Sequence, residues 1–174
     1  MKIVMINGSP RHGNVYAAIN ALREGAEGEN TVEILEASKL NVSPCNGCNA
    51  CECYKGCVAT DDSNAVVDKL VAADMIVFGT PVYWWGMSAQ LKTIIDKCYC
   101  KGALLKGKKI GIVVCGGAPT DDEEYELIRR QFECMAEFLN WDIRFFKAYY
   151  AMGKDSLAGD EKAVAEFRAL AEKI

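Results

Sequence analysis

The chain has 174 residues, of which 51% are hydrophobic and 25% charged, and its formal net charge is −4. This length suits one domain, 1–174, and the acidic balance argues against nucleic acid or an anionic membrane as the main partner. Because no apolar run approaches the ~20 residues of a membrane span and no signal peptide is visible, we expect a cytoplasmic protein.

Strand patterns and helix patterns alternate along the chain. Short apolar runs predict strands, and apolar residues at helical spacing predict helices. The expected elements are strands at Lys2–Ile6, Thr31–Glu36, Met75–Gly79, Lys109–Cys115 and Asp142–Met152, and helices at Asn14–Glu27, Ser63–Ala73, Ser88–Tyr99, from the capping-box spacing Thr120–Glu123 onward, and Asp160–Ile174. This alternation predicts a doubly wound, five-stranded parallel sheet in a three-layer α/β/α sandwich.

One segment interrupts the alternation. Residues 38–62 combine Ser, Asn, Pro and Gly with a group of cysteines and form a long loop insertion. Loops of this length are uncommon and usually functional. In doubly wound sheets, ligands bind beyond the carboxyl ends of the strands. We therefore look for a site in the loop and in residues 7–14, 80–86 and 115–119, which follow strands.

The turn after the first strand, MINGSPRHGN, is rich in hydrogen-bond donors. Backbone N–H groups, the side chains of Ser9 and Asn14, and the Arg11 guanidinium precede a helix N-terminus, which suits a phosphate. The turn lacks G-K-[ST] and G-x-G-x-x-G, so it is neither a hydrolase P-loop nor a dinucleotide fingerprint. The alternative is a polar connection that binds nothing. His12 is interpreted as a solvated loop residue rather than a catalytic base.

The segment Thr80–Gly86, TPVYWWG, places three adjacent aromatic residues at a strand end. They cannot all enter one core, so at least one ring is exposed, where a flat ligand could stack. The alternative is ordinary packing in the core or at a subunit interface. A phosphate turn beside an aromatic turn describes a site for a nucleotide-like ligand. Residues 115–119, CGGAP, would form its third wall, where glycines allow close backbone approach.

These motifs together resemble the NAD(P)H-dependent FMN reductase family over nearly the whole chain. The resemblance rests on Gly8–Arg11 with Gly13-Asn14, on Gly79–Trp84, and on Gln90–Lys92 with Ile95–Lys97. It implies a flavodoxin-like fold, bound FMN, NAD(P)H as co-substrate, and a homodimer or homotetramer with flavins near the interface. The chemistry would be flavin-based, with no catalytic residue supplied by the protein.

The resemblance also implies which residues bind the cofactor. The phosphate would be held by Ser9, Arg11, Gly13, Asn14 and the amide of Val15. The isoalloxazine would be lined by Pro81, Val82, Tyr83, Trp84 and Gly86, and on its other side by Cys115, Gly116 and Gly117. Family members commonly carry Thr or Ser where this chain has Val15. A hydroxyl contact is therefore missing, and we expect somewhat weaker phosphate binding.

Five of the nine cysteines lie in the stretch CNGCNACECYKGC. The spacing C-x2-C-x2-C-x5-C suits an iron–sulfur cluster, because short gaps wrap successive thiolates around one cluster, and Gly47 and Gly56 would permit the tight loop. The iron–sulfur flavoprotein subgroup implies a 4Fe–4S cluster here. Zinc and reduced thiols shaping a lid are the alternatives. The ligands would be Cys45, Cys48, Cys51 and Cys57.

The remaining cysteines receive no ligand role. Cys53 is an extra cysteine within the loop, whereas Cys98, Cys100 and Cys134 fall on helix patterns and are expected to be buried small hydrophobic residues.

Three functions are compatible with these motifs. The first is an FMN-dependent oxidoreductase that passes electrons from NAD(P)H to a small-molecule or protein acceptor. The second is an iron–sulfur flavoprotein that carries electrons from ferredoxin to a partner without turning over NAD(P)H. The third is a zinc-organised binding module, against which the phosphate and aromatic turns argue. Consumption of NADH or NADPH distinguishes the first from the second.

Overall fold

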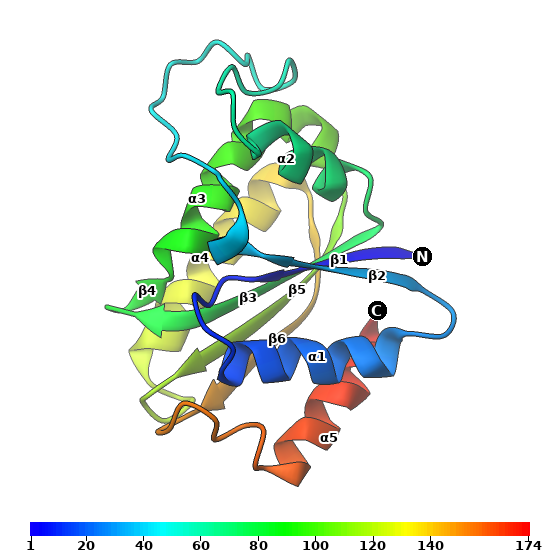
Figure 1. The fold of residues 1–174 in the computed structure, drawn as a ribbon, viewed down its shortest axis with the longest axis vertical. Coiled ribbons are helices and arrows are strands. Elements are labelled where there is room, and N and C mark those ends of the chain that lie inside the picture. The colour runs from blue at the N-terminus through cyan, green and yellow to red at the C-terminus, as the bar shows by residue number, and fades with distance from the viewer.

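The computed structural model describes all residues, 1–174, as a sheet with helices on both faces (Figure 1). The strands are β1 (Lys2–Asn7), β2 (Thr31–Glu36), β3 (Met75–Tyr83), β4 (Gly86–Met87), β5 (Lys109–Gly116) and β6 (Asp142–Tyr150). The α-helices are α1 (Asn14–Ala26), α2 (Ser63–Val71), α3 (Ala89–Cys98), α4 (Glu123–Leu139) and α5 (Glu161–Ala169). Short 3-10 segments lie at Ala37–Lys39, Tyr99–Leu105 and Leu170–Lys173.

Five parallel strands run in the order β2-β1-β3-β5-β6, which confirms the predicted doubly wound, flavodoxin-like sheet. The sequence did not predict β4, which pairs antiparallel with the end of β3 and makes the sheet six-stranded. None of the helices combines the length and the apolar character that crossing a membrane requires.

Several predicted element boundaries were wrong. The last helix was expected to run to Ile174, but α5 ends at Ala169 and gives way to a 3-10 segment, and β6 ends at Tyr150 rather than Met152. Strand β3 continues past Gly79 to Tyr83, because its last residues pair with β4 and with β5. Helix α4 begins at Glu123, and its N-cap is Asp122, whose carboxylate accepts a hydrogen bond from the Glu124 N–H at 3.1 Å. The Thr120–Glu123 capping box therefore does not form, since a stronger cap lies two residues further on.

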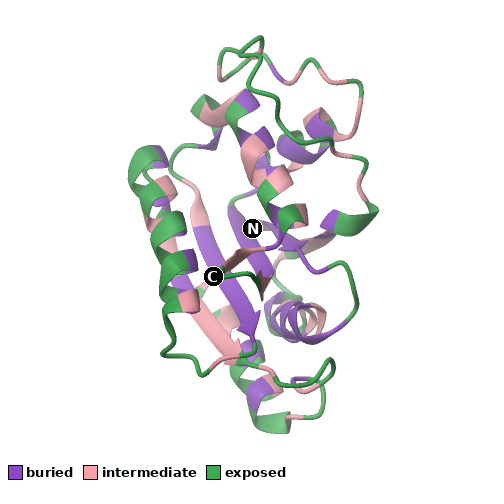
Figure 2. Cartoon of the chain, turned by 90° about the vertical axis from the view of Figure 1, so that its left-hand side faces the viewer, coloured by how far each residue is buried: buried purple, intermediate pink, exposed green.

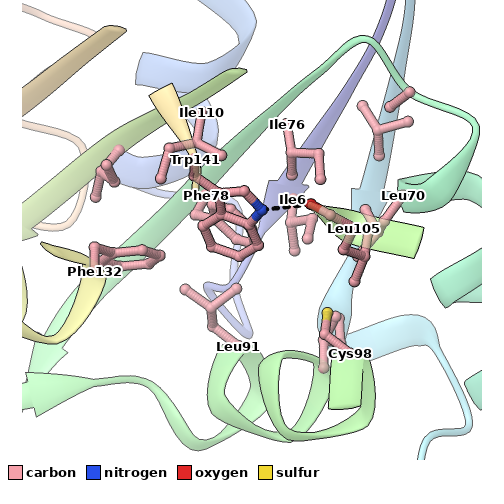
Figure 3. Close-up of a cluster of buried hydrophobic side chains, with 14 of the residues drawn as sticks. Ile6, Leu70, Ile76, Phe78, Leu91, Cys98, Leu105, Ile110, Phe132 and Trp141 are labelled. Atoms are coloured by element: carbon pink, nitrogen blue, oxygen red, sulfur yellow. Dashed lines mark hydrogen bonds between the residues drawn. The ribbon is translucent and has the colours of Figure 1, made fainter. Parts of the chain in front are cut away.

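Each face of the sheet has its own hydrophobic core. One core packs β-strand residues against α2, α3 and α4, and the other packs them against α1 and α5. Figure 2 shows the buried strands between helices whose outer faces are exposed. Figure 3 shows the first core, where the Phe78 ring lies 5.2 Å from that of Phe132 and 5.9 Å from that of Trp141. The Trp141 indole N–H donates to the Leu105 carbonyl at 2.6 Å, which satisfies its buried polar group.

Candidate functional site

The turn between β1 and α1 is shaped by its own side chains. The Ser9 hydroxyl donates to the Arg11 carbonyl at 2.8 Å and accepts from the Arg11 N–H at 3.3 Å, and the Ser9 N–H donates to Asn7 Oδ1 at 3.1 Å. Gly13 precedes α1 and provides no side-chain cap. The first N–H groups of α1 therefore lack a capping acceptor and carry the positive end of the helix dipole, which is the geometry of an anion site.

Asn14 and Val15 face the interior more than the sequence suggested. Asn14 Nδ2 donates to the Gly153 carbonyl at 2.7 Å, and Asn14 Oδ1 accepts from the Leu157 N–H at 2.8 Å. The amide thus ties residues 153–157 to the turn and has one N–H left for a ligand. The Val15 side chain is buried in the core, so the backbone N–H is the polar group it can offer. Arg11 is exposed.

His12 lies on the surface of the turn. Its Nε2 atom is 2.6 Å from Glu36 Oε2, and its ring stacks on Tyr16 with 4.0 Å between centroids. Hydrogen bonds from Lys39 and from His12 hold the pKa of the Glu36 carboxyl below its ordinary value. This pair could not be predicted from the sequence, because Glu36 ends a different strand. The pairing restrains the outer wall of the turn.

The aromatic segment forms a β-hairpin whose two-residue turn is Trp84-Trp85. Both residues have left-handed φ angles, 49° and 59°. Trp84 is 91% exposed and Tyr83 is 43% exposed, which confirms that a ring of this segment faces outward. The left-handed region costs a bulky residue about 1–2 kcal/mol. Strain of this kind, held at the edge of a predicted site, points to a functional role for the hairpin.

A buried polar network joins the two turns beneath the surface. The Ser88 N–H donates to Thr80 Oγ1 at 2.9 Å, and the Ser88 hydroxyl donates to the Gly8 carbonyl at 2.7 Å. The Gly8 N–H in turn donates to the Gly79 carbonyl at 2.8 Å. Ser88 is also the N-cap of α3, accepting from the Leu91 N–H at 3.2 Å. Ser88 was not among the predicted site residues, although a serine directly before a helix is a capping signal.

The end of β5 forms the third side of this edge. Cys115 pairs in register with Pro81, and burial raises the pKa of its thiol to about 12, so it remains neutral. Gly116 is tightly enclosed: an added Cβ would lie 2.3 Å from Glu124 Oε1 and 2.7 Å from the Tyr125 hydroxyl. Glu124 Oε1 is buried without a hydrogen-bond partner. This unpaired acceptor, which the sequence analysis missed, would be satisfied by a ligand donor.

The remaining predicted residues lie on the same edge. Val82 approaches Gly116, and Gly86 pairs with Tyr83 in the hairpin. Gly117 is exposed. The three segments after β1, β3 and β5 therefore meet at one edge of the sheet. Donors for an anion lie at one end, and an unpaired acceptor lies at the other.

The cysteine-rich loop forms a second feature, which projects beyond α2 and the end of α3 (Figure 1). Its stem is closed by two aspartates. Asp61 accepts from the Ser43 hydroxyl at 2.5 Å, from the Ser43 N–H at 2.9 Å and from the Ser63 N–H at 2.9 Å, and Asp62 accepts from the Asn41 N–H at 2.7 Å. The hydrogen bonds from Ser43 and Ser63 lower the pKa of Asp61.

The tip of the loop turns sharply at residues with left-handed φ angles. Gly47 and Gly56 are among them, which agrees with their predicted role, and the others are Asn49, Glu52 and Cys53. The Gly56 N–H donates to the Cys100 carbonyl at 3.1 Å, and the Ala103 N–H donates to the Cys53 carbonyl at 3.2 Å. These contacts attach the loop to the segment that follows α3.

All four predicted cysteine ligands line a single cavity of about 570 Å³, which we call the cysteine cavity. No group of three or more His, Cys, Asp or Glu side chains is placed to hold a metal ion. A zinc ion requires thiolates about 2.3 Å from one point, whereas a cluster spreads its ligands around its corners. Four thiols that line one cavity are the ligand type that either group requires. The cavity is also lined by Ser43, Pro44, Asn46, Gly47, Asn49, Val58, Ala59, Asp96, Lys97, Tyr99 and Cys100.

The other cysteines follow the prediction in part. Burial raises the pKa of the Cys98 thiol to about 12, and burial also raises the pKa of Cys100. Cys100 nevertheless lines the cysteine cavity, which its helix pattern did not reveal. Cys134 is exposed, so its predicted burial was wrong, because it falls on the outer face of α4.

The fold and this edge define a flavodoxin-like α/β protein, and comparison with known proteins gives its family. The model of the NADPH-dependent FMN reductase family matches residues 1–129, so the chain belongs to that family. An iron–sulfur flavoprotein of Methanosarcina thermophila is 35% identical over 132 residues, which are 71% of this chain and 68% of that protein. One from Methanocaldococcus jannaschii is 37% identical over 131 residues, 71% of this chain and 66% of that protein.

The chain therefore spans only about two thirds of the length of these two relatives. It spans 56% of a second iron–sulfur flavoprotein from Methanocaldococcus jannaschii. Among solved structures, Smu.1420 from Streptococcus mutans superposes with a TM-score of 0.75 at 19% identity, and the alignment covers 100% of both chains. This likeness supports the fold.

Proposed function

We propose that the protein is an FMN-dependent oxidoreductase that passes electrons from NAD(P)H to a small-molecule or protein acceptor. Membership of the NADPH-dependent FMN reductase family carries the proposal. The edge formed after β1, β3 and β5 supports it, because an uncapped helix N-terminus suits the phosphate of FMN. The unpaired Glu124 oxygen suits a ring that donates an N–H. Bound FMN would supply hydride acceptance and release of electrons.

In this proposal the protein binds and orients the cofactor. Arg11 and the first N–H groups of α1 contact the phosphate, and Ser9 shapes the turn that presents them. The Tyr83-Trp84 hairpin forms a platform for the ring, with Gly116 on the opposite side. The set of cofactor-binding residues is Ser9, Arg11, Gly13, Asn14, Val15, Pro81, Val82, Tyr83, Trp84, Gly86, Cys115, Gly116 and Gly117.

We assign no acid–base step to a side chain of this edge. Burial keeps Cys115 protonated, and burial also raises the pKa of Tyr125, whose hydroxyl donates to the Ala118 carbonyl at 2.8 Å. The experiment that tests the function is an anaerobic absorption spectrum of the purified protein, followed by addition of NADH or NADPH. We expect flavin bands that bleach on addition of a nicotinamide. Absence of flavin bands, even after FMN is supplied, would contradict the proposal.

A second candidate is an iron–sulfur flavoprotein that carries electrons from ferredoxin to a protein partner. The placement of Cys45, Cys48, Cys51 and Cys57 around one cavity favours it, as do the names of the relatives. In this candidate the four cysteines would hold a 4Fe–4S cluster, which would supply one-electron transfer. Iron and acid-labile sulfide in the same sample, with no bleaching by NADH or NADPH, would favour the carrier over the reductase.

We also propose that residues 1–174 form one domain and that the chain assembles as a homodimer or homotetramer. Trp84 and Trp85 support assembly, because they are 91% and 53% exposed on the isolated chain and their rings pack edge to face on each other. Sedimentation of the FMN-loaded protein tests this assembly, which a monomeric species at micromolar concentration would contradict.

A further inference from the structure

Lys97 is a buried cation that the sequence analysis assigned to no site. It belongs to the last turn of α3 and is 4% exposed. Its ammonium contacts two groups, Cys57 Sγ at 3.4 Å and Ser43 Oγ at 3.5 Å. A buried charge is retained only where opposite charge or strong hydrogen bonds compensate for its lost hydration. Neither contact provides this.

The nearby carboxylates are engaged elsewhere. Asp96 also lines the cysteine cavity, but it pairs with Lys92 at 2.5 Å. Asp61 is reached only through Ser43, whose hydroxyl it holds at 2.5 Å. No carboxylate forms an ion pair with Lys97 directly. The positive charge of Lys97 is therefore directed at the cavity and at the sulfur of Cys57.

We propose that Lys97 is a positioning residue that compensates the negative charge of a thiolate-ligated iron–sulfur group in the cysteine cavity. This inference rests on the second candidate above. Four thiolates around a cluster make the group anionic, and neutral thiols would leave the ammonium without a counter-charge. Because reduction adds further negative charge, Lys97 stabilises the reduced form more and raises the midpoint potential.

The test compares the wild type with Lys97→Met, Lys97→Arg and Lys55→Met. Lys55 is a matched control. It lies in the cysteine-rich loop, pairs with Glu52 and is half exposed, and its replacement by Met changes the net charge by the same amount as Lys97→Met. Each protein is prepared metal-free and after anaerobic reconstitution with ferrous iron and sulfide. The measurements are bound iron and sulfide, loss of iron to a chelator, the midpoint potential, and the urea midpoint of the metal-free form.

We expect Lys97→Met to weaken retention of the cluster by about tenfold or more and to lower the midpoint potential. The metal-free Lys97→Met protein should be at least as resistant to urea as the wild type, because an uncompensated charge is removed. Lys97→Arg should restore retention, and Lys55→Met should leave it unchanged.

Two results would overturn the inference. One is an equal loss of stability in the metal-free and reconstituted Lys97→Met proteins, which would make Lys97 purely structural. The other is a wild-type protein that binds no iron and sulfide. Flavin content and bleaching by nicotinamide are read on the same samples, so the proposed oxidoreductase function is judged separately from the role of Lys97.

Discussion

The sheet edge and the cysteine loop are built in opposite ways. The edge is assembled from short turns fixed by strand register and by the buried network of Thr80, Ser88 and Gly8. The loop has no regular structure between residues 40 and 62, and it is held by side-chain hydrogen bonds at its stem. Helix α3 joins the two regions, with Ser88 at its start and Lys97 in its last turn. At about 1.5 Å per residue, these residues lie about 14 Å apart along the helix.

The two regions therefore differ in what determines their conformation. At the edge, the turns continue directly from the strands β1, β3 and β5, and backbone and buried side-chain hydrogen bonds hold them in place. The cysteine cavity gathers the thiols without placing three of them at one metal position. We therefore expect binding at the edge to depend on backbone shape, and binding in the loop to depend on the ligand that draws the cysteines together.

The largest expected effect is the difference in alkylation rate between exposed and buried cysteines. In the metal-free protein at mildly alkaline pH, the exposed Cys45, Cys48 and Cys134 should react first, and Cys98 and Cys115 last. Burial raises the pKa of the Cys98 and Cys115 thiols from 9.0 to about 12, which lowers their thiolate fraction about a thousandfold. Mass spectrometry of alkylated peptides over time measures the order. Rapid labelling of Cys115 would show that the edge opens in solution.

Gly8→Val should damage the edge most. An added Cβ would lie 2.6 Å from the Gly79 carbonyl and 2.8 Å from Leu91 Cβ, so the backbone must move. We expect a loss of about 2–3 kcal/mol in the free energy of unfolding, together with loss of FMN binding. Urea unfolding and fluorescence titration measure both. Gly102→Ala, which has open space, is the control and should change stability by less than about 0.5 kcal/mol.

Asp61→Asn should loosen the stem of the loop by a smaller amount. Because hydrogen bonds lower the folded pKa of Asp61, its contribution is complete above the unfolded value near 3.9 and is lost as the pH falls through the folded pKa. At pH 7 we expect a loss of about 1 kcal/mol, after discounting for solvent. The difference from wild type should shrink in strong acid. If the difference in unfolding free energy between wild type and Asp61→Asn did not depend on pH, the Asp61 carboxylate would not be what stabilises the stem.

Relaxing the hairpin turn should change stability by a similar amount in the opposite direction. Replacing Trp84-Trp85 by Asn-Gly provides residues that favour left-handed φ angles. We expect unfolding to become about 1 kcal/mol less favourable, with FMN binding weakened. Chemical unfolding and FMN titration of the double variant test whether stability rises while FMN affinity falls. Gain of stability with unchanged binding would mean that the aromatic rings do not contact the cofactor.

The sequence predicted the sheet well because its strands are continuous apolar runs. Strand β4 was not predicted, because two residues carry no periodic signal. Thr120 was predicted as the cap of α4 in place of Asp122, because both are residue types that cap helices. Lys97 could not be found from the sequence. A lysine in an amphipathic helix is normally predicted to be exposed. The residues that contact Lys97, Cys57 and Ser43, lie 40 and 54 positions away in the sequence.

The most direct test of the account compares FMN with riboflavin, which lacks the phosphate, in equilibrium titrations of the flavin-free protein. If the turn between β1 and α1 holds the phosphate, FMN should bind at least about a hundredfold more tightly, equivalent to about 3 kcal/mol of charge-assisted hydrogen bonds. Arg11→Ala should narrow that ratio, since the guanidinium contacts only the phosphate in this account. Equal affinity for the two flavins would contradict the account, because it would leave the anion site at the sheet edge without its ligand.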